Sequence, residues 1–354
     1  MLRLFLVLLH SSLALMLLAQ NQGTSDYIKS NNASNLQNKK PSKVNWLSLE
    51  EAMLKREKEV KPILIDFYTD WCGWCKKMDQ STYSNQNIVN YINTYYYPVK
   101  FNAETRDSIL YKGQFYVNNG EGRRPTHSLA IKLLNGKLSY PSTLIIDKNE
   151  GQTILSGYLD AGEIQPILFY VKDEAYKFSP YEEFKTYFNH TFKPDSSTLA
   201  DLDGKIHWMR MQDALELQRK KPKKIWLNLY TDWESSSKMM QSTYKHPYIA
   251  KFINEHFYAV RIEAINRDTI TFFEHTFTNS GQDPSYHDFV TAILDRKMQF
   301  PAVVIFDENS KRIPPIQSYM GPRATEKVMR YYGDNHYKTT DWPSFNKEFI
   351  SSFE

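Results

Sequence analysis

Two cysteines, Cys72 and Cys75, stand three positions apart in the segment DWCGWCK, and the 354-residue sequence contains no others. At this spacing on a helix, two thiols share a face and can form a disulfide. A bridge that closes so short a loop adds little stability, because the entropic effect of a disulfide grows with loop length. The pair therefore indicates thiol–disulfide exchange more than a structural cross-link.

Exchange needs one ionised thiol to attack and a second thiol to release the mixed disulfide. Cys72 is expected at the first turn of a helix, where unpaired N–H groups and the positive dipole end lower a thiol pKa. Cys75, one turn deeper, is expected to be more buried and less reactive. The sequence thus predicts an accessible thiol at Cys72 and a resolving thiol at Cys75.

Zinc binding and a purely structural or vestigial disulfide are the alternatives for this pair. Structural zinc normally takes four protein ligands. The sequence has no second cysteine pair, and its nine histidines form no tight pattern beside this one. We therefore expect no metal and no cofactor, while the structural disulfide stays open as an alternative.

The N-terminus has the layout of a secretory signal peptide. Arg3 precedes an apolar run from Leu4 to about Ala19, and polar residues follow at once. We expect a signal peptide over residues 1–20 and a flexible tether, rich in Asn, Ser, Gln and Lys, over residues 21–43. The protein is then exported, with the periplasm as the expected compartment, where thiols meet oxidants. An uncleaved membrane anchor is the alternative.

Composition indicates a globular chain, with 41% apolar and 24% charged residues. The formal net charge is only +4, and the basic residues are spread along the sequence. No Lys/Arg stripe of the kind that binds nucleic acid is visible, so no nucleic-acid partner is expected.

Internal similarity shows that the sequence contains two copies of one unit. ILIDFYTDWCGWCKKMDQSTY at 63–83 matches IWLNLYTDWESSSKMMQSTY at 225–244, and a second pair of segments matches at 127–149 and 287–309. The offset stays between 160 and 162 residues. We expect a first domain at 44–190, a linker at 191–204 and a second domain at 205–354.

Each copy predicts a mixed sheet with helices on both faces, hence an α/β fold. After Pro141 a strand, a polar turn with Gly151 and a second strand indicate a hairpin. The other expected elements of the first copy are a helix at 48–59, a strand at 63–68, a helix from the cysteines to about 95, a strand at 97–103, a helix at 127–134 and a closing helix at 161–176.

These features resemble the thioredoxin superfamily. WCGWCK follows the strand ILIDFY, Asp66 lies six residues before Cys72, and YPSTLIID stands where thioredoxins carry a cis-proline. The resemblance implies two tandem thioredoxin-like domains, with Cys72 attacking, Cys75 resolving and a cis bond between Tyr140 and Pro141. A longer stretch between residues 105 and 140 is similar to a subgroup of exported bacterial thioredoxin-like proteins of poorly defined role.

Asp66 stands on an apolar strand, where burial raises the pKa of a carboxyl. Such a group can exchange protons with Cys75 through water, and the resemblance implies that role because thioredoxins use the matching acid in this way. An Asp at the sheet edge or on the surface is the alternative.

Substrate binding is expected at Trp71, Trp74, Tyr140 and Pro141. The two tryptophans predict an apolar rim for a protein substrate, although core packing is an alternative for Trp71. The resemblance places the cis-proline beside the dithiol, where the preceding backbone can pair with an extended substrate.

The second copy acts as an internal control, because DWESSSK replaces DWCGWCK and Asn228 replaces Asp66. Its dithiol and its proton acceptor are therefore missing together. Both copies keep three residues, which therefore require a structural explanation first: Trp71/Trp233, Pro141/Pro301 and His127/His287.

The sequence thus predicts an exported thiol–disulfide oxidoreductase with one active and one degenerate domain, working more in the reducing direction. Its expected partners are protein substrates with disulfides or thiols and a membrane-bound redox protein. A substrate-binding or chaperone-like module and a redox sensor, each with a secondary dithiol, are the alternatives.

Overall fold

The computed structural model describes residues 43–120, 123–196, 199, 202–281 and 285–353. Contacts divide this part of the chain into two compact units, and the boundary in the sequence lies between Lys172 and Asp173. The signal peptide expected at residues 1–20 and all but the last residue of the expected tether lie outside the described residues. Among the described residues, no helix is both long and apolar enough to cross a membrane.

The first unit is built on a four-stranded mixed sheet with the order β2-β1-β5-β6. The central strand β1 (Ile63–Tyr68) runs parallel to β2 (Tyr97–Asn102) and antiparallel to β5 (Ser142–Ile146), and β5 pairs antiparallel with β6 (Gln152–Ser156). The hairpin expected after Pro141 is therefore present, and the mixed α/β fold is confirmed.

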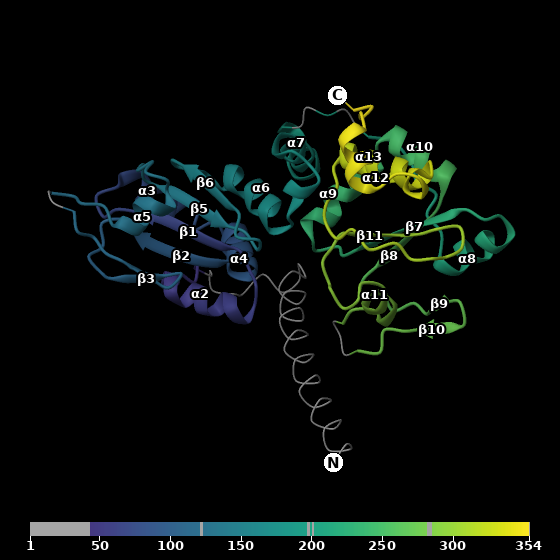
Figure 1. The fold of residues 1–354 in the computed structure, drawn as a ribbon, viewed down its shortest axis with the longest axis horizontal. Helices are drawn as coiled ribbons and strands as arrows, with labels where there is room; N and C mark the ends of the chain where they lie inside the picture. The colour runs from purple at the N-terminus through teal and green to yellow at the C-terminus, as the bar shows by residue number, and fades with distance from the viewer. Residues whose placement is uncertain (1–42, 121–122, 197–198, 200–201, 282–284, 354) are drawn as a thin grey trace, which may run out of the picture. The chain divides into compact units, whose positions relative to one another are not determined.

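Helices cover both faces of this sheet (Figure 1). The helices α2 (Leu49–Lys58) and α5 (Ser128–Leu133) pack on one face, and α3 (Gly73–Ser81), α4 (Gln86–Tyr95) and α6 (Ala161–Lys172) pack on the other.

Alternation along β1 decides which side chain faces which layer. Ile63, Ile65 and Phe67 join the core under α2 and α5, whereas Leu64 joins the core under α3, α4 and α6. Successive side chains of a strand point to opposite faces. Asp66 therefore lies on the same face as Leu64, toward the layer that contains the cysteine helix.

The single helix expected from the cysteines to about residue 95 is wrong, because the structure has two helices there. The helix α3 ends at Ser81, and α4 begins at Gln86. Asn85 is the N-cap of α4, and its side chain accepts hydrogen bonds from the backbone N–H groups of Asn87 and Ile88. This cap satisfies N–H groups that a continuous helix would have bonded internally.

The stretch between β2 and α5 contains a hairpin that the sequence did not predict. It consists of β3 (Ile109–Tyr111) and β4 (Gln114–Tyr116). The two turn residues, Lys112 and Gly113, have φ values of 50° and 76°. Positive φ at both central positions matches the twist of a two-residue hairpin turn.

The second unit repeats this plan with a smaller sheet of order β11-β7-β8. Where the first unit has β6, the second has only isolated bridges to β11, at Ile316 and Arg312. The strands are β7 (Lys224–Tyr230), β8 (Phe257–Glu263) and β11 (Ala302–Phe306), with a separate hairpin of β9 (Ile270–Phe272) and β10 (His275–Phe277). The helices are α8 (Met211–Lys220), α9 (Ser235–Tyr244), α10 (Pro247–His256), α11 (Asp288–Ile293), α12 (Pro322–Gly333) and α13 (Trp342–Glu348).

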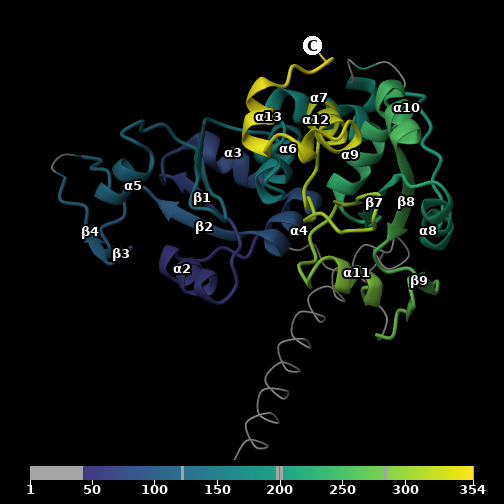
Figure 2. The same cartoon turned by 45° about the vertical axis from the view of Figure 1, so that its right-hand side comes forward.

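One helix of the first sequence repeat belongs to the second unit. The helix α7 (Tyr181–Phe192) packs against α9, as Figures 1 and 2 both show. It buries Phe184, Tyr187 and Phe188. The boundary between compact units thus lies 18 residues before the expected end of the first domain at residue 190. Short 3-10 helices complete the connections at Ala175–Lys177, Pro194–Ser196 and His336–Lys338.

Candidate functional site

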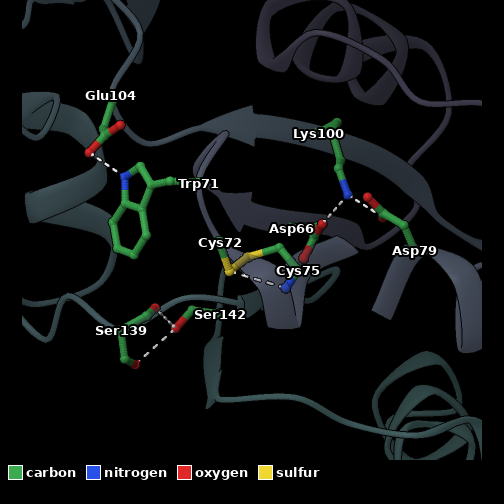
Figure 3. The surroundings of a disulfide bond; sticks show 9 residues. All are labelled: Asp66, Trp71, Cys72, Cys75, Asp79, Lys100, Glu104, Ser139 and Ser142. Atoms are coloured by element: carbon green, nitrogen blue, oxygen red, sulfur yellow. Dashed lines mark hydrogen bonds and ion pairs between the residues drawn. A yellow bond between two sulfur atoms is a disulfide. The ribbon is translucent and has the colours of Figure 1, made fainter. Parts of the chain in front are cut away.

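Cys72 and Cys75 form a disulfide at the start of α3 (Figure 3). Cys72 is the N-cap residue, directly after the loop that leaves β1, and its Cα lies 5.3 Å from that of Cys75. The backbone N–H of Cys75 donates a hydrogen bond of 3.1 Å to the Sγ of Cys72. The helix start therefore directs an N–H donor at this sulfur, an arrangement that favours negative charge there.

The two cysteines are almost equally buried, with exposed fractions of 4% for Cys72 and 3% for Cys75. The sequence predicted an accessible Cys72 above a more buried Cys75. That prediction is wrong for this disulfide-bonded structure, in which the Sγ of Cys72 bonds to Cys75 and accepts the backbone N–H of that residue.

Asp66 is buried on β1 with an exposed fraction of 1%, so the alternative of a surface carboxylate is excluded. Its Oδ2 accepts a hydrogen bond of 2.6 Å from the Nζ of Lys100, and its buried Oδ1 has no protein partner. Lys100 stands opposite Asp66 on β2 and also pairs with Asp79 of α3. The site therefore contains a carboxylate–ammonium–carboxylate chain that leads from the interior to the surface (Figure 3).

Burial raises the pKa of Asp66 from its ordinary value of 3.8 to about 6, although the charge and hydrogen bond of Lys100 lower it and Asp79 raises it further. Burial also lowers the pKa of Lys100, but the two carboxylates more than offset this, so its net pKa lies above the ordinary 10.5. Lys100 therefore stays charged near neutral pH, whereas Asp66 changes its protonation just below neutrality.

A cleft of about 530 Å³ opens beside Lys100. The Nζ of Lys100 lies 5.1 Å from the ring centres of both Trp46 and Tyr68 and 5.6 Å from that of Tyr83. The cleft is lined by Lys43, Val44, Trp46, Asp79, Tyr83, Ser84, Gln86 and Lys100. This cleft gives water a route to the charged chain that ends at Asp66.

Trp71 and Trp74 are both exposed, at 49% and 57%, so core packing does not explain either ring. The indole N–H of Trp71 donates to Glu104 at 2.9 Å, and the guanidinium of Arg124 lies 4.4 Å from the ring centre. Trp74 packs on Tyr158, with ring centres 5.5 Å apart. The two exposed indoles thus present apolar surface next to the cysteines in sequence, Trp71 directly before Cys72 and Trp74 directly before Cys75.

Tyr140 and Pro141 precede β5, and the peptide bond between them is cis. Pro141 is buried, and Tyr140 is half-buried against the core under α2 and α5. Beside them, the hydroxyl of Ser142 donates to the carbonyl of Ser139 at 2.6 Å. Figure 3 places Ser139 and Ser142 in the surroundings of the disulfide, although the sequence had not singled out either residue.

The two shared histidines have the same structural task. His127 is the N-cap of α5, where its Nδ1 accepts the backbone N–H of Leu129 at 3.2 Å and its Nε2 lies 3.1 Å from the carbonyl of Asp107. His287 repeats this arrangement at α11, with Nδ1 accepting the N–H of Phe289 at 3.1 Å. Capping accounts for the presence of both histidines.

The second unit lacks the charged chain as well as the dithiol. Asn228 at the position of Asp66 accepts a hydrogen bond of 3.2 Å from the hydroxyl of Tyr244. Arg261 stands opposite Asn228, as Lys100 stands opposite Asp66. Its guanidinium lies 3.9 Å from the ring centre of Tyr230, and no carboxylate pairs with it among the described residues.

Lys100 and Asp79 are the site residues that sequence reasoning missed. Both occupy positions at which the copies differ, because Arg261 replaces Lys100 and Met240 replaces Asp79. The loss of the acid at position 79, which accompanies the loss of the cysteines, was thus the available signal, whereas Arg261 keeps the charge of Lys100 and gave none. Within the described ranges, no group of three or more His, Cys, Asp or Glu side chains could hold a metal ion.

Residues 25–154 match a thioredoxin-like family, Thioredox_DsbH, which is described as a protein of unknown function, DUF255. The thiol:disulfide interchange protein DsbD of Photorhabdus laumondii is 24% identical over 121 residues, or 33% of this chain. The alignment spans only 17% of that relative's own length.

Solved structures of thioredoxin-fold proteins are also similar. A DsbH oxidoreductase is 19% identical, with a TM-score of 0.28 over 38% of this chain and 90% of that one. A thioredoxin-fold protein from Helicobacter pylori is 17% identical, with a TM-score of 0.30 over 44% and 92% of the two chains. Scores of this size carry no structural conclusion, so the fold rests on the sheet topology. By this family match, residues 25–154 are similar to the thioredoxin-like family, and the mixed sheet with the cysteine helix after β1 agrees with that similarity.

Proposed function

We propose that the protein is an exported thiol–disulfide oxidoreductase that exchanges disulfides with protein substrates through Cys72 and Cys75. The observation that carries this proposal is the disulfide at the N-terminus of α3, where a backbone N–H donates to the Sγ of Cys72. The similarity of the chain to a thiol:disulfide interchange protein is consistent with this class of reaction.

In the reducing direction, the thiolate of Cys72 attacks one sulfur of a substrate disulfide. A mixed disulfide forms, and the other substrate sulfur leaves as a thiolate. The thiolate of Cys75 then attacks the Sγ of Cys72, which releases the second substrate thiol. The product is the Cys72–Cys75 disulfide, the state that the structure describes.

Asp66 is proposed as the proton acceptor for Cys75 in the second step. Its pKa of about 6 lets it take a proton near neutral pH, which a surface carboxylate does poorly. Lys100 positions this carboxylate through the 2.6 Å ion pair, and the cleft beside Lys100 lets the proton leave to water. Lys100 is in this account a positioning residue.

The return to the reduced state needs two electrons from a donor. Outside the cytosol we propose a membrane-bound redox protein as this donor. Fractionation of cells that produce the chain with and without residues 2–20 tests export. Equal amounts outside the cytosol in both cases would contradict it.

Insulin reduction in the presence of a dithiol reductant tests the activity. We expect turbidity from the released insulin chains with the wild type and only the background rate with Cys72→Ser. Ser235→Ala, at the start of the matching helix of the second unit, is the control and is expected to keep full activity. Equal rates for wild type and Cys72→Ser would remove the proposal.

A substrate-binding or chaperone-like module is the second candidate, and the exposed indoles of Trp71 and Trp74 favour it. Cys75→Ser produced in cells separates the two functions. Mixed disulfides trapped on Cys72 indicate the enzyme. Unchanged binding of the same partners after removal of both cysteines indicates the module.

A further inference from the structure

Each unit has its own surface beside the helix that follows its first strand, and the two surfaces can be compared residue by residue. Thr82 donates to the carbonyl of Leu159 at 2.6 Å, and Thr243 donates to the carbonyl of Met320 at 3.3 Å. Because these bonds join matching elements, Tyr158 of the first unit corresponds to its neighbour in the second, Tyr319.

In the second unit, α7 covers this surface. The rings of Phe184 and Tyr319 meet edge to face with centres 5.4 Å apart, and Tyr319 is fully buried. Near the end of α7, the hydroxyl of Thr191 lies 3.0 Å from that of Ser242, the counterpart of Ser81. The aromatic face of α7 is thus buried against the surface around Tyr319 and Ser242, which lies beside the helix that has lost the cysteines.

The covering segment consists of residues 173–192, and its first residue, Asp173, contacts the position that corresponds to Cys75. The hydroxyl of Ser236 donates to the carboxylate of Asp173, and Ser318 donates to its carbonyl at 2.9 Å. Ser236 stands three positions before Met239, as Cys75 stands three positions before Met78. Residues 173–192 therefore lie on the second unit with one end at the former cysteine site and a helix on the adjacent aromatic surface.

The matching surface of the first unit, here called the Tyr158 surface, consists of Trp74, Lys77, Ser81 and Tyr158. Trp74 contacts Tyr158 in the first unit, as Phe184 contacts Tyr319 in the second. However, Trp74 is 57% exposed and Tyr158 is only half-buried, so among the described residues of the first unit no helix covers this surface as α7 covers Tyr319. The Nζ of Lys77 lies 4.6 Å from the ring centre of Trp74 and 5.2 Å from that of Tyr158. This surface is thus aromatic, cationic and adjacent to a disulfide.

We propose that the Tyr158 surface binds an amphipathic helix of the protein substrate, and that the reactive cysteine of the substrate precedes this helix. Residues 173–192 show the binding mode, since Phe184 follows Asp173 by 11 positions and Phe188 extends the same apolar face. This inference rests on the proposed function and specifies its substrate.

Charge supports an acidic first turn in the substrate helix. The first turn of α7 carries Glu182 and Glu183, and acidic residues are favourable at a helix N-terminus. In the second unit this turn pairs with a cation, since Glu183 lies 3.7 Å from Arg323. On the Tyr158 surface the cation is Lys77, which lies over two aromatic rings and favours an acidic occupant. An acidic aromatic helix is therefore the expected occupant, in preference to a basic one.

A peptide probe tests this binding mode. The probe has the sequence of residues 173–192 with Asp173→Cys, and its cysteine carries thionitrobenzoate as a mixed disulfide. With the full chain carrying Cys75→Ser, the Cys72 thiolate attacks the peptide sulfur, a peptide–Cys72 disulfide forms, and coloured thionitrobenzoate leaves. Because the described second unit has no cysteine, the release reports only on the first unit.

The control peptide carries Phe184→Ala and Phe188→Ala in addition. At subsaturating peptide concentration, we expect the aromatic peptide to release thionitrobenzoate about tenfold faster, or more. A tenfold difference in affinity needs only about 1.4 kcal/mol of binding free energy. Tyr158→Ala in the protein is expected to remove most of this difference, whereas Lys77→Glu is expected to slow both acidic peptides. Glutathione disulfide, which has no helix, is expected to react equally with the protein with and without Tyr158→Ala.

Equal rates for the two peptides, with rapid reaction of glutathione disulfide, would overturn the binding mode and leave the proposed function intact. Slow reaction of Cys72 with every disulfide would overturn the proposed function as well. Sedimentation provides a further check, because Phe345 of α13 and Phe349, the residue that caps its C-terminus, stand at the positions of Phe184 and Phe188. Self-association that Phe349→Ala abolishes would assign the surface to a second copy of this chain and overturn the substrate proposal.

Discussion

At the scale of single residues, the chemistry depends on how Asp66 is held. A buried carboxylate is costly unless it is paired, and Lys100 supplies one partner while Oδ1 stays without one. Desolvation outweighs the ion pair, so the pKa of Asp66 rises to about 6. The residue is thereby less stable as an anion and more useful as a proton acceptor.

Asp66→Asn, which copies the residue found at Asn228, is expected to remove a pH dependence of stability. Because the folded pKa of about 6 exceeds the ordinary 3.8, the stability that the protonated carboxyl contributes is fully present below pH 3.8 and is lost as the pH rises to 6. The wild type should lose about 3 kcal/mol at most over this window. Urea unfolding at several pH values measures the slope.

The control for this prediction is Asp79→Asn, which removes the outer partner of Lys100 but leaves the buried carboxyl. It should keep the slope between pH 4 and 6. An Asp66→Asn protein whose stability falls over that window as steeply as the wild type would contradict the assignment. At pH 7, Asp66→Asn should raise the free energy of unfolding by less than the stability that the wild type loses over this pH window. The reason is that the substitution also removes an ion-pair partner of Lys100.

Reduction is expected to free Cys72 from its position over α3. In the reduced protein we expect iodoacetamide to alkylate Cys72 faster than Cys75, with an apparent pKa below the ordinary value of about 8.5. Mass spectrometry after short exposure at several pH values measures both rates. A faster Cys75, or a Cys72 titration near 8.5, would contradict the assigned roles.

The burial of Asp66 could be predicted because its neighbours in ILIDFY are apolar. The ion pair could not, because it depends on the register that sets Lys100 opposite Asp66 across two strands 34 residues apart. Asp79 was similarly hidden, since a polar residue on an exposed helix position usually needs no partner.

At the scale of elements, two helix caps test whether the shared histidines act in structure or in chemistry. We expect His127→Ala and His287→Ala each to cost about 1–2 kcal/mol of stability, because each removes an N-cap acceptor from a short helix. Thermal unfolding and insulin reduction by the folded variants measure the two effects. A His127→Ala protein that folds normally but loses activity would show a chemical role.

The element boundaries show what local patterns can and cannot predict. The helix starting at the cysteines was predicted, and Asn85 was an available signal for the break before α4. The hairpin of β3 and β4 was not predictable from its short strands, because Lys112 adopts a positive φ that the sequence gives no reason to expect. Such a conformation is set by the surrounding structure.

At the scale of the whole molecule, the division between units places α7 with the second unit, and this has a measurable consequence. A fragment of residues 173–354 should be more stable than one of residues 193–354, because the latter exposes Tyr319 and loses the packing of Phe184. Losing one fully buried Phe side chain costs about 3–5 kcal/mol. Thermal unfolding of both fragments measures the difference.

The matched controls are the first-unit fragments 44–172 and 44–192, whose stabilities should be equal. Higher stability of the longer fragment would assign α7 to the first unit instead. The duplication alone could not locate this boundary, because the apolar face of α7 predicts burial without saying which partner buries it. Only the folded structure shows Phe184 against Tyr319.

The position of α7 also affects how the protein is made. Phe184 leaves the ribosome 135 residues before Tyr319. At a synthesis rate of about 5–20 residues per second, this gap lasts about 7–27 s. During that time a nascent chain carries an aromatic helix whose binding surface has not yet been translated, so this helix is where a chaperone would be expected to engage the growing polypeptide.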